Sequence, residues 1–218
     1  EEGVAADGAP VDSDADKTED KTSTELTGTV STDGSTSMEK VIGALSESFM
    51  AQNGGVTVNY NPTGSGSGIT AVQEGTCDIG LSSRALKDDE KNDVDGTTVA
   101  LDGIAIIVNK DSKVADLTVD QLKQMFTGEI TNWKDVGGKD QAIVAFQRGE
   151  DSGSQTLFKK LLIQGGELMT PPSELAPAAM GELVDSIADY NNSANAIGFS
   201  VYYYIDQMYS KPGLRLLA

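Results

Sequence analysis

The sequence contains no histidine, and this absence excludes the commonest nucleophilic sites. A Ser-His-Asp triad or a Cys-His pair needs an imidazole as its general base. The single cysteine, Cys77, excludes an internal disulfide, and without histidine it also excludes a Cys/His metal cluster. Its surroundings, TCDIG at residues 76–80, predict a buried strand and therefore a structural thiol. We expect no metal, no cofactor and no enzymatic activity.

Positive charge is also scarce, because 16 Lys and Arg residues face 34 Asp and Glu residues and leave a net charge of −18. This balance argues against a nucleic-acid partner. It does not exclude a small anion, since backbone N–H groups at helix starts create a locally positive field. Long apolar runs are missing too. The longest, IAIIV at 104–108, is too short to span a bilayer and suits a buried strand.

The first 25 residues have almost nothing to bury. They carry nine acidic residues against Lys17 and Lys21, and they have no aromatic residue. This composition predicts a disordered acidic tether over residues 1–25. A regular pattern of apolar residues begins only at Leu26.

From Leu26 onward the pattern alternates between strands and helices, which predicts an α/β fold with a mostly parallel sheet. Thr118 is expected to cap the helix at 119–126, and Gly128 is expected to end it. Strands are expected at 26–30, 56–60, 77–81, 97–100, 103–109, 142–146, 196–200 and 214–217, and helices at 38–50, 69–74, 119–126, 152–162, 180–190 and 201–208.

Three junctions share one composition: a strand, a turn rich in Gly, Ser and Thr, and then a helix. They are TDGSTS at 32–37, TGSGSG at 63–68 and RGEDSGS at 148–154. Ligands of open α/β sheets bind at the carboxyl edge of the strands, beside helix N-termini. Small residues let the backbone approach a tetrahedral anion closely. The three turns together predict a shared anion site.

Each turn also has a simpler interpretation. A Ser/Thr/Gly turn before a helix is often only an N-cap. The second turn reads G-x-G-x-G, which is not the G-x-G-x-x-G pattern of dinucleotide sites. Arg148 ends a strand and could grip two oxygens of an anion, with Glu150 as its orienting partner, or it could form a surface ion pair of little consequence. Ser152 could be a hydrolase nucleophile, but we interpret it as a donor to an anion.

Six stretches resemble the phosphate-binding protein of high-affinity phosphate ABC transporters. They are DGSTS at 33–37, TGSGSGI at 63–69, CDIGLSSR at 77–84, FTGEITNWKDVGG at 126–138, RGEDSGS at 148–154 and AIGFSVYYY at 196–204. The resemblance runs from about Leu26 to the end. The fourth stretch is the most specific, and its role is expected to be architectural, with Trp133 packed inside the second lobe.

The resemblance implies a two-lobe clamshell of the periplasmic-binding-protein type II class that closes on orthophosphate. Lobe one would span 26–100, and 101–218 would hold lobe two and the start of the return to lobe one. Family members continue beyond the counterpart of Ala218, so we expect either that the sequence is a shortened piece of such a protein or that the C-terminal part of the first lobe is missing. Carried over position by position, the phosphate ligands fall on Ser35, Thr36, Ser37, Ser65, Ser83, Arg148, Ser152, Gly153 and Ser154, with Glu150 in support.

One position departs from the pattern. Well-known members have an aspartate that accepts the proton of hydrogen phosphate and rejects sulfate, and this position falls on Ser83. A hydroxyl does not repel a dianion as a carboxylate would, so selectivity over sulfate is open. Serine also replaces the family's threonine at Ser154, which keeps the hydroxyl.

The resemblance implies an extracytoplasmic solute-binding protein that passes phosphate to an ABC transporter permease. It would be a monomer, held to the membrane only by a lipid anchor outside this sequence. Three alternatives stay open. One is a receptor for another tetrahedral oxyanion, sulfate or molybdate. Another is a sensor or adhesion module of the same fold. The third, of a different class, is a phosphate-ester hydrolase that uses Ser152.

Overall fold

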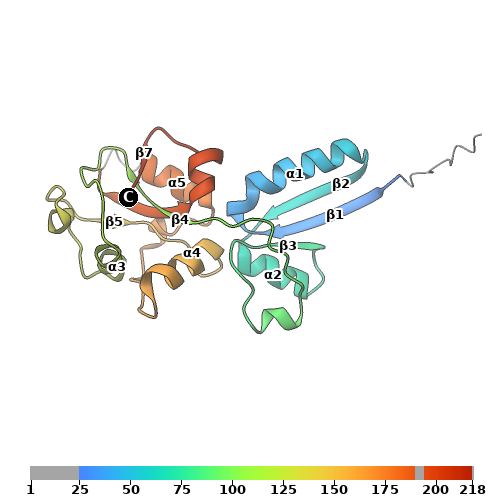
Figure 1. Cartoon of the computed structure of the whole chain (residues 1–218), viewed down its shortest axis with the longest axis horizontal. Coiled ribbons are helices and arrows are strands. Elements are labelled where there is room, and N and C mark those ends of the chain that lie inside the picture. Colours follow the sequence, from blue (N-terminus) through green and yellow to red (C-terminus); the bar gives the residue numbers. More distant parts are fainter. Residues whose placement is uncertain (1–24, 190–193, 218) are drawn as a thin grey trace, which may run out of the picture.

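The computed structural model describes residues 25–189 and 194–217, and within them the strands form two separate sheets (Figure 1). The acidic tether expected at residues 1–25 lies outside the described residues, apart from Glu25. The first sheet has the order β2-β1-β3, and both of its pairings are parallel. Its strands are β1 (Thr27–Gly34), β2 (Gly55–Pro62) and β3 (Ile79–Leu81), and its helices are α1 (Glu39–Gln52) and α2 (Ser65–Gln73).

The second sheet has the order β5-β6-β4-β7 and is mixed. Strand β5 is parallel to β6, whereas β4 is antiparallel to both β6 and β7, so the expected mostly parallel arrangement holds only for the first sheet. The strands are β4 (Ile104–Asn109), β5 (Val144–Ala145), β6 (Ala196–Val201) and β7 (Leu214–Leu216), and the helices are α3 (Val119–Thr127), α4 (Gly153–Phe158) and α5 (Met180–Asp189).

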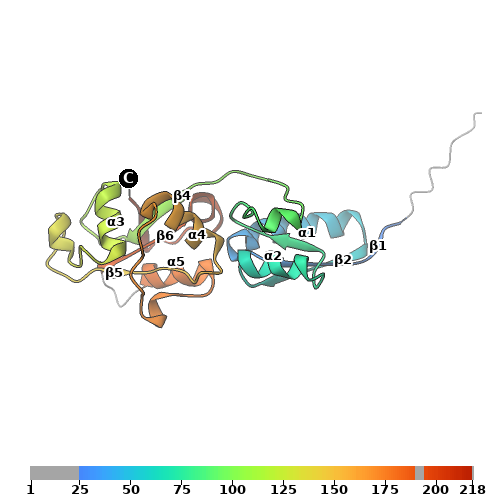
Figure 2. The ribbon, with the colours of Figure 1, turned by 90° about the horizontal axis from the view of Figure 1, so that it is seen from below.

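Shorter helical turns complete the described chain. Four are 3₁₀ turns, at Thr36–Met38, Glu90–Asn92, Trp133–Val136 and Ser173–Leu175. Two are π-helical, at Lys159–Ile163, which continues α4, and at Tyr204–Met208. The segment after Glu90–Asn92 runs from the first sheet to β4 without regular structure (Figure 2).

Two local expectations were wrong. Residues 97–100 form no strand, and Val99 is 72% exposed. Cys77 precedes β3 and is only half buried, in a stretch that is mostly exposed, so it does not sit in a buried strand. No strand pairs with residues 97–100, and at Cys77 the strand begins only two residues later, at Ile79. This shows that local preference alone did not decide the structure.

Helix α3 follows its sequence signals closely. Thr118 Oγ1 accepts a hydrogen bond from the N–H of Gln121, and the Gln121 side chain accepts one from the N–H of Thr118. This reciprocal capping box satisfies two donors that the helix would otherwise leave free. Gly128 ends the helix with φ +85°, a left-handed conformation that glycine adopts without strain.

The best-packed core lies under the second sheet. Phe126, Phe158 and Phe199 are at most 1% exposed, and Trp133 donates from Nε1 to the carbonyl of Asn195 at 2.9 Å. Trp133 is thus packed against this sheet, as the sequence predicts. By contrast, helix α1 on the first sheet has no fully buried residue among those described. The second sheet therefore carries most of the apolar core.

Replacing Phe158 should reveal the stability of this core. Its ring stacks on that of Phe199 with centroids 4.1 Å apart and meets Phe126 edge-on at 4.7 Å. Phe158→Ala is expected to lower the free energy of unfolding by about 3–5 kcal/mol, measured by urea titration. The control is Leu161→Ala, because Leu161 follows in the same helical segment but is 53% exposed. Equal effects of the two changes would contradict this assignment.

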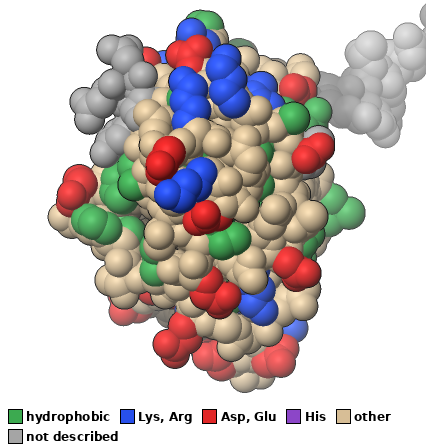
Figure 3. Space-filling view, turned by 90° about the vertical axis from the view of Figure 1, so that its left-hand side faces the viewer, with side chains coloured by type: hydrophobic (Ala, Val, Ile, Leu, Met, Phe, Trp, Pro, Cys, Tyr) green, Lys and Arg blue, Asp and Glu red, His purple; other side chains and the backbone are tan. Residues whose placement is uncertain are grey.

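The end of the molecule farthest from the first sheet has a mixed surface (Figure 3). In that view Lys and Arg side chains gather in the upper part, and Asp and Glu side chains are more frequent below. This face therefore shows no continuous basic surface of the kind that binds nucleic acid.

Candidate anion-binding site

The first turn is fixed by contacts within the first sheet. A Cβ on Gly34 would lie 2.2 Å from the carbonyl oxygen of Leu81, so only glycine permits this approach of β1 to β3. The N–H of Ser35 donates to that same oxygen at 2.9 Å, and the Tyr60 hydroxyl donates to the carbonyl of Ser35. Burial, more than nearby carboxylates, raises the pKa of Tyr60 to about 12, which keeps the hydroxyl protonated as a donor.

Three serine hydroxyls meet at the edge of the first sheet. Ser35 Oγ donates to Ser83 Oγ at 3.0 Å, and Ser65 Oγ lies 3.2 Å from Ser83 Oγ. The N–H of Ser83 donates to Ser65 Oγ at 3.1 Å. Ser35 precedes the first helical turn, yet its side chain makes no capping hydrogen bond. The simple N-cap interpretation therefore fails for Ser35, since its hydroxyl is directed into a cluster shared by three segments.

The third turn comes from the second sheet and contacts this cluster. A Cβ on Gly153 would lie 2.3 Å from Ser65 Oγ and 2.6 Å from Ser83 Oγ. Ser152 caps α4 by accepting from the N–H of Gln155, and its Oγ lies 2.9 Å from that of Ser154. The third turn therefore combines an N-cap with a place at the boundary between the two sheets.

Arg148 is a buried cation with one nitrogen unpaired among the described residues. Its side chain donates from Nε to the carbonyl of Pro177 and from Nη2 to the carbonyl of Ala178 and to Thr36 Oγ1, at 2.6–3.1 Å. Nη1 is buried, and among the described residues it has no hydrogen-bond partner. Arg148 is 5% exposed, and burial lowers its pKa to about 10, so the guanidinium is still protonated at neutral pH. A buried charge with an unpaired donor favours an anion at that point.

Glu150 does not orient Arg148, contrary to the sequence-based expectation. Its side chain is exposed, and its Oε1 lies 4.0 Å from Lys159 Nζ. The carbonyls of Pro177 and Ala178 accept the hydrogen bonds from Arg148 that Glu150 was expected to accept. Backbone carbonyls leave no signature in a sequence, so this part of the site could not have been predicted.

Thr36 joins the two sheets at a second point. Besides accepting from Arg148, its Oγ1 accepts from the N–H of Met180, the first residue of α5, at 3.2 Å. The N-terminus of α5 thus also faces the first turn, which the sequence did not indicate. Ser37 follows Thr36 and is half buried, but no hydrogen bond of its side chain to the cluster is found within the described chain.

The structure therefore brings most of the expected residues together. Contacts between the two sheets form two groups. Thr36 meets Arg148 in one of them, and in the other Ser35, Ser65 and Ser83 meet the turn that holds Ser152, Gly153 and Ser154. The arrangement supplies hydroxyls, helix-start N–H groups and one full positive charge. This set of groups can bind an anion. Among the hydrogen bonds described, the Ser152 hydroxyl contacts only Gln155 and Ser154.

Comparison with known proteins supports this architecture. Residues 17–209 match the family described as a PBP superfamily domain. The phosphate-binding protein PstS of Bacillus subtilis is 34% identical over 206 residues, which are 93% of this chain and 65% of that protein. PstS 2 of Streptococcus pneumoniae is 39% identical over 117 residues, 54% of this chain and 40% of that protein. The chain thus spans about two thirds or less of these relatives.

Solved structures agree with the sequence comparison. A Clostridium perfringens protein, described as a phosphate ABC transporter substrate-binding protein and solved with bound phosphate, has 32% identity and a TM-score of 0.78. The alignment covers 87% of this chain and 75% of that one. An ABC-type phosphate transport receptor from Vibrio cholerae has 28% identity and a TM-score of 0.64, covering 86% and 75%.

The fold is that of a two-lobe α/β substrate-binding protein, in which each lobe carries one of the two sheets. The chain belongs to the PBP superfamily, as the match over residues 17–209 shows.

Proposed function

We propose that this chain captures inorganic phosphate between its lobes and delivers it to the permease of an ABC transporter. Lobe one would comprise residues 26–100, and 101–218 would form lobe two with the start of the return to lobe one. The observation that carries the proposal is the buried Nη1 of Arg148, which has no hydrogen-bond partner among the described residues, while Nη2 of the same guanidinium donates to Thr36 of the other sheet. The names of the relatives point to the same ligand.

The proposed ligands are the residues predicted from the sequence. Ser35, Thr36, Ser37, Ser65, Ser83, Ser152, Gly153 and Ser154 would surround phosphate with hydroxyl and N–H donors, and Arg148 would supply the one full charge. Ser37 would do so through its backbone N–H, since no hydrogen bond of its side chain to the cluster is found within the described residues. Fixed dipoles in a water-poor site stabilise an anion more strongly than they would in water. The site binds and releases its ligand without chemistry.

The selectivity of the site for phosphate over other oxyanions depends on Ser83. Ser83 contributes a hydroxyl where a carboxylate would reject a fully deprotonated anion, and it is bonded only to Ser35 and Ser65 among the described side chains. The second candidate ligand is therefore another tetrahedral oxyanion, sulfate or molybdate. A sensor or adhesion module of the same fold would instead bind none of them.

The proposed place of action is outside the cytoplasm. The chain would act as a monomer, tethered through its acidic N-terminal segment to a lipid anchor that lies outside this sequence. No helix in the described ranges is long and apolar enough to cross a membrane. The partners would be phosphate and the permease, with no nucleic acid.

Calorimetric titration of anion-free protein at pH 8 tests the proposal, because Arg148, with a pKa of about 10, is still protonated there. We expect one phosphate to bind per chain and sulfate to bind more weakly. Comparable binding of both anions would make this a general oxyanion receptor and trace the cause to Ser83. Silence with both would favour the sensor or adhesion module. Turnover of a chromogenic phosphomonoester would instead support the hydrolase.

A further inference from the structure

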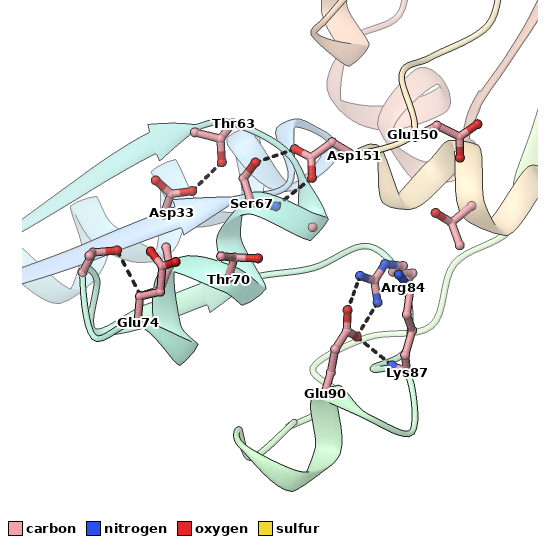
Figure 4. Close-up of a pocket in the computed structure, with 14 residues that line it drawn as sticks. Asp33, Thr63, Ser67, Thr70, Glu74, Arg84, Lys87, Glu90, Glu150 and Asp151 are labelled. Carbon is pink, nitrogen blue, oxygen red and sulfur yellow. Dashed lines mark hydrogen bonds and ion pairs between the residues drawn. The ribbon is translucent and has the colours of Figure 1, made fainter.

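A carboxylate from lobe two occupies the start of a helix in lobe one. Asp151 Oδ1 accepts from the N–H of Ser67 and Oδ2 accepts from the Ser67 hydroxyl, both at 2.7 Å. The N–H of Gly66 also donates to the carbonyl oxygen of Asp151 at 3.1 Å. Figure 4 shows the Asp151 side chain directed at the first turn of α2, whereas Glu150 points the other way.

The glycines of the second turn make room for this carboxylate. A Cβ on Gly64 would lie 2.1 Å from Asp151 Oδ2, and a Cβ on Gly66 would lie 2.2 Å from Oδ1. Two of the three glycines in the G-x-G-x-G run thus stand against a single side chain from the other lobe. The glycines allow a close approach here, but the group that approaches is Asp151.

This contact is separate from the anion-binding cluster. Ser152, and not Asp151, caps α4, and the three hydrogen bonds that Asp151 accepts within the described ranges all come from Gly66 and Ser67. It lies in the wall of an open cleft of about 590 Å³, which Arg84 and Glu90 also line. A carboxylate at the first turn of α2 gains from the helix dipole, and its hydrogen bonds are charge-assisted.

We infer that Asp151 is a positioning residue that holds the two lobes in the closed arrangement without touching the ligand. The inference rests on the proposed function, since closure matters here because it encloses phosphate. Hydrogen bonds that form only on closing raise the population of the closed state, and the apparent affinity for the ligand rises with that population. Loss of the contact should therefore speed the release of phosphate.

Charge repulsion alone predicts the opposite change in phosphate affinity, so the test separates the two explanations. A negative charge near an anion site repels phosphate, so its removal should tighten binding if Asp151 were only a neighbouring acid. Asp151→Asn keeps the shape, removes the charge and sets the amide NH2 against one of the two Ser67 donors. We expect phosphate affinity to fall about tenfold, in the lower range for charge-assisted bonds because Asp151 is exposed to solvent.

Glu150→Gln is the matched control, since it removes one acidic charge from the same turn, and the carboxylate of Glu150 lies 4.0 Å from Lys159 of its own lobe. It should leave affinity unchanged or slightly higher. Ser67→Ala removes one of the three bonds and should weaken binding less than Asp151→Asn. The double variant should be no weaker than Asp151→Asn alone, because the two changes remove one shared contact. Titration calorimetry gives the affinities, and stopped-flow release gives the dissociation rates.

Small-angle scattering supplies a measurement that does not depend on phosphate affinity. Asp151→Asn should have a larger radius of gyration than the unaltered protein under the same conditions. If the unaltered protein binds phosphate and Asp151→Asn binds it as tightly or more tightly, Asp151 is no closure residue and the proposed function survives. If the unaltered protein binds no phosphate, the proposed function fails. Equal radii of gyration would then overturn the role of Asp151 as well.

Discussion

An Arg148→Ala variant is expected to bind phosphate about 150- to 4000-fold more weakly than the unaltered protein. Arg148 is 5% exposed, and its Nη1 is the free buried donor at the boundary between the lobes. Removing the charged partner of a buried anion costs about 3–5 kcal/mol, because the ligand then loses its compensating charge. Titration calorimetry on anion-free protein measures the loss directly.

The same arginine also holds the carbonyls of Pro177 and Ala178, so its role in folding must be separated from its role in binding. Thermal unfolding without phosphate measures the structural part. Arg148→Lys keeps the charge but cannot reach two carbonyls and an anion at once, and we expect it to bind with intermediate affinity. Unchanged affinity in Arg148→Ala, with the fold intact, would refute the assignment of the site.

Gly153→Ala is expected to weaken phosphate binding about 10- to 100-fold while leaving the fold as stable as before. The new Cβ would lie 2.3 Å from Ser65 Oγ and 2.6 Å from Ser83 Oγ, both in the other lobe. Such overpacking costs about 1–3 kcal/mol, and here it is incurred only when the lobes close. Alanine in the first turn of α4 is itself more favourable than glycine.

Gly149→Ala is the control for this steric effect. Gly149 lies in the same turn, but a Cβ there would meet nothing within 4 Å, so both stability and affinity should stay unchanged. Phosphate titration and thermal unfolding of both variants complete the test. If Gly153→Ala bound phosphate normally, the lobes would not close in the arrangement described.

The sequence predicted those parts of the fold whose causes are local. The Thr118 side chain caps the N-terminus of α3, and the left-handed backbone of Gly128 ends the helix, both as expected. The strand expected at 97–100 failed because β-branched residues need a neighbouring strand, and none pairs with them. Strand β4 is antiparallel to β6 and β7, which lie far from it in the sequence, and no local pattern of residues predicts the direction of such a pairing.

The candidate site was predictable to a similar extent. Its three turns carry a recognisable composition, and the structure brings them together at the boundary between the two sheets. The partners that orient Arg148 are backbone carbonyls at Pro177 and Ala178, and these could not be read from residue types. Asp151 was part of a predicted turn, but its target 84 residues away in α2 became visible only in three dimensions.

A crystal structure of the protein grown with phosphate would test the central claim most directly. We predict a tetrahedral anion within hydrogen-bonding distance of Arg148 Nη1, enclosed by Thr36 and by the turn from Ser152 to Ser154. An anion found instead in the open cleft beside Arg84, or lobes that close with the Arg148 site empty, would contradict the account.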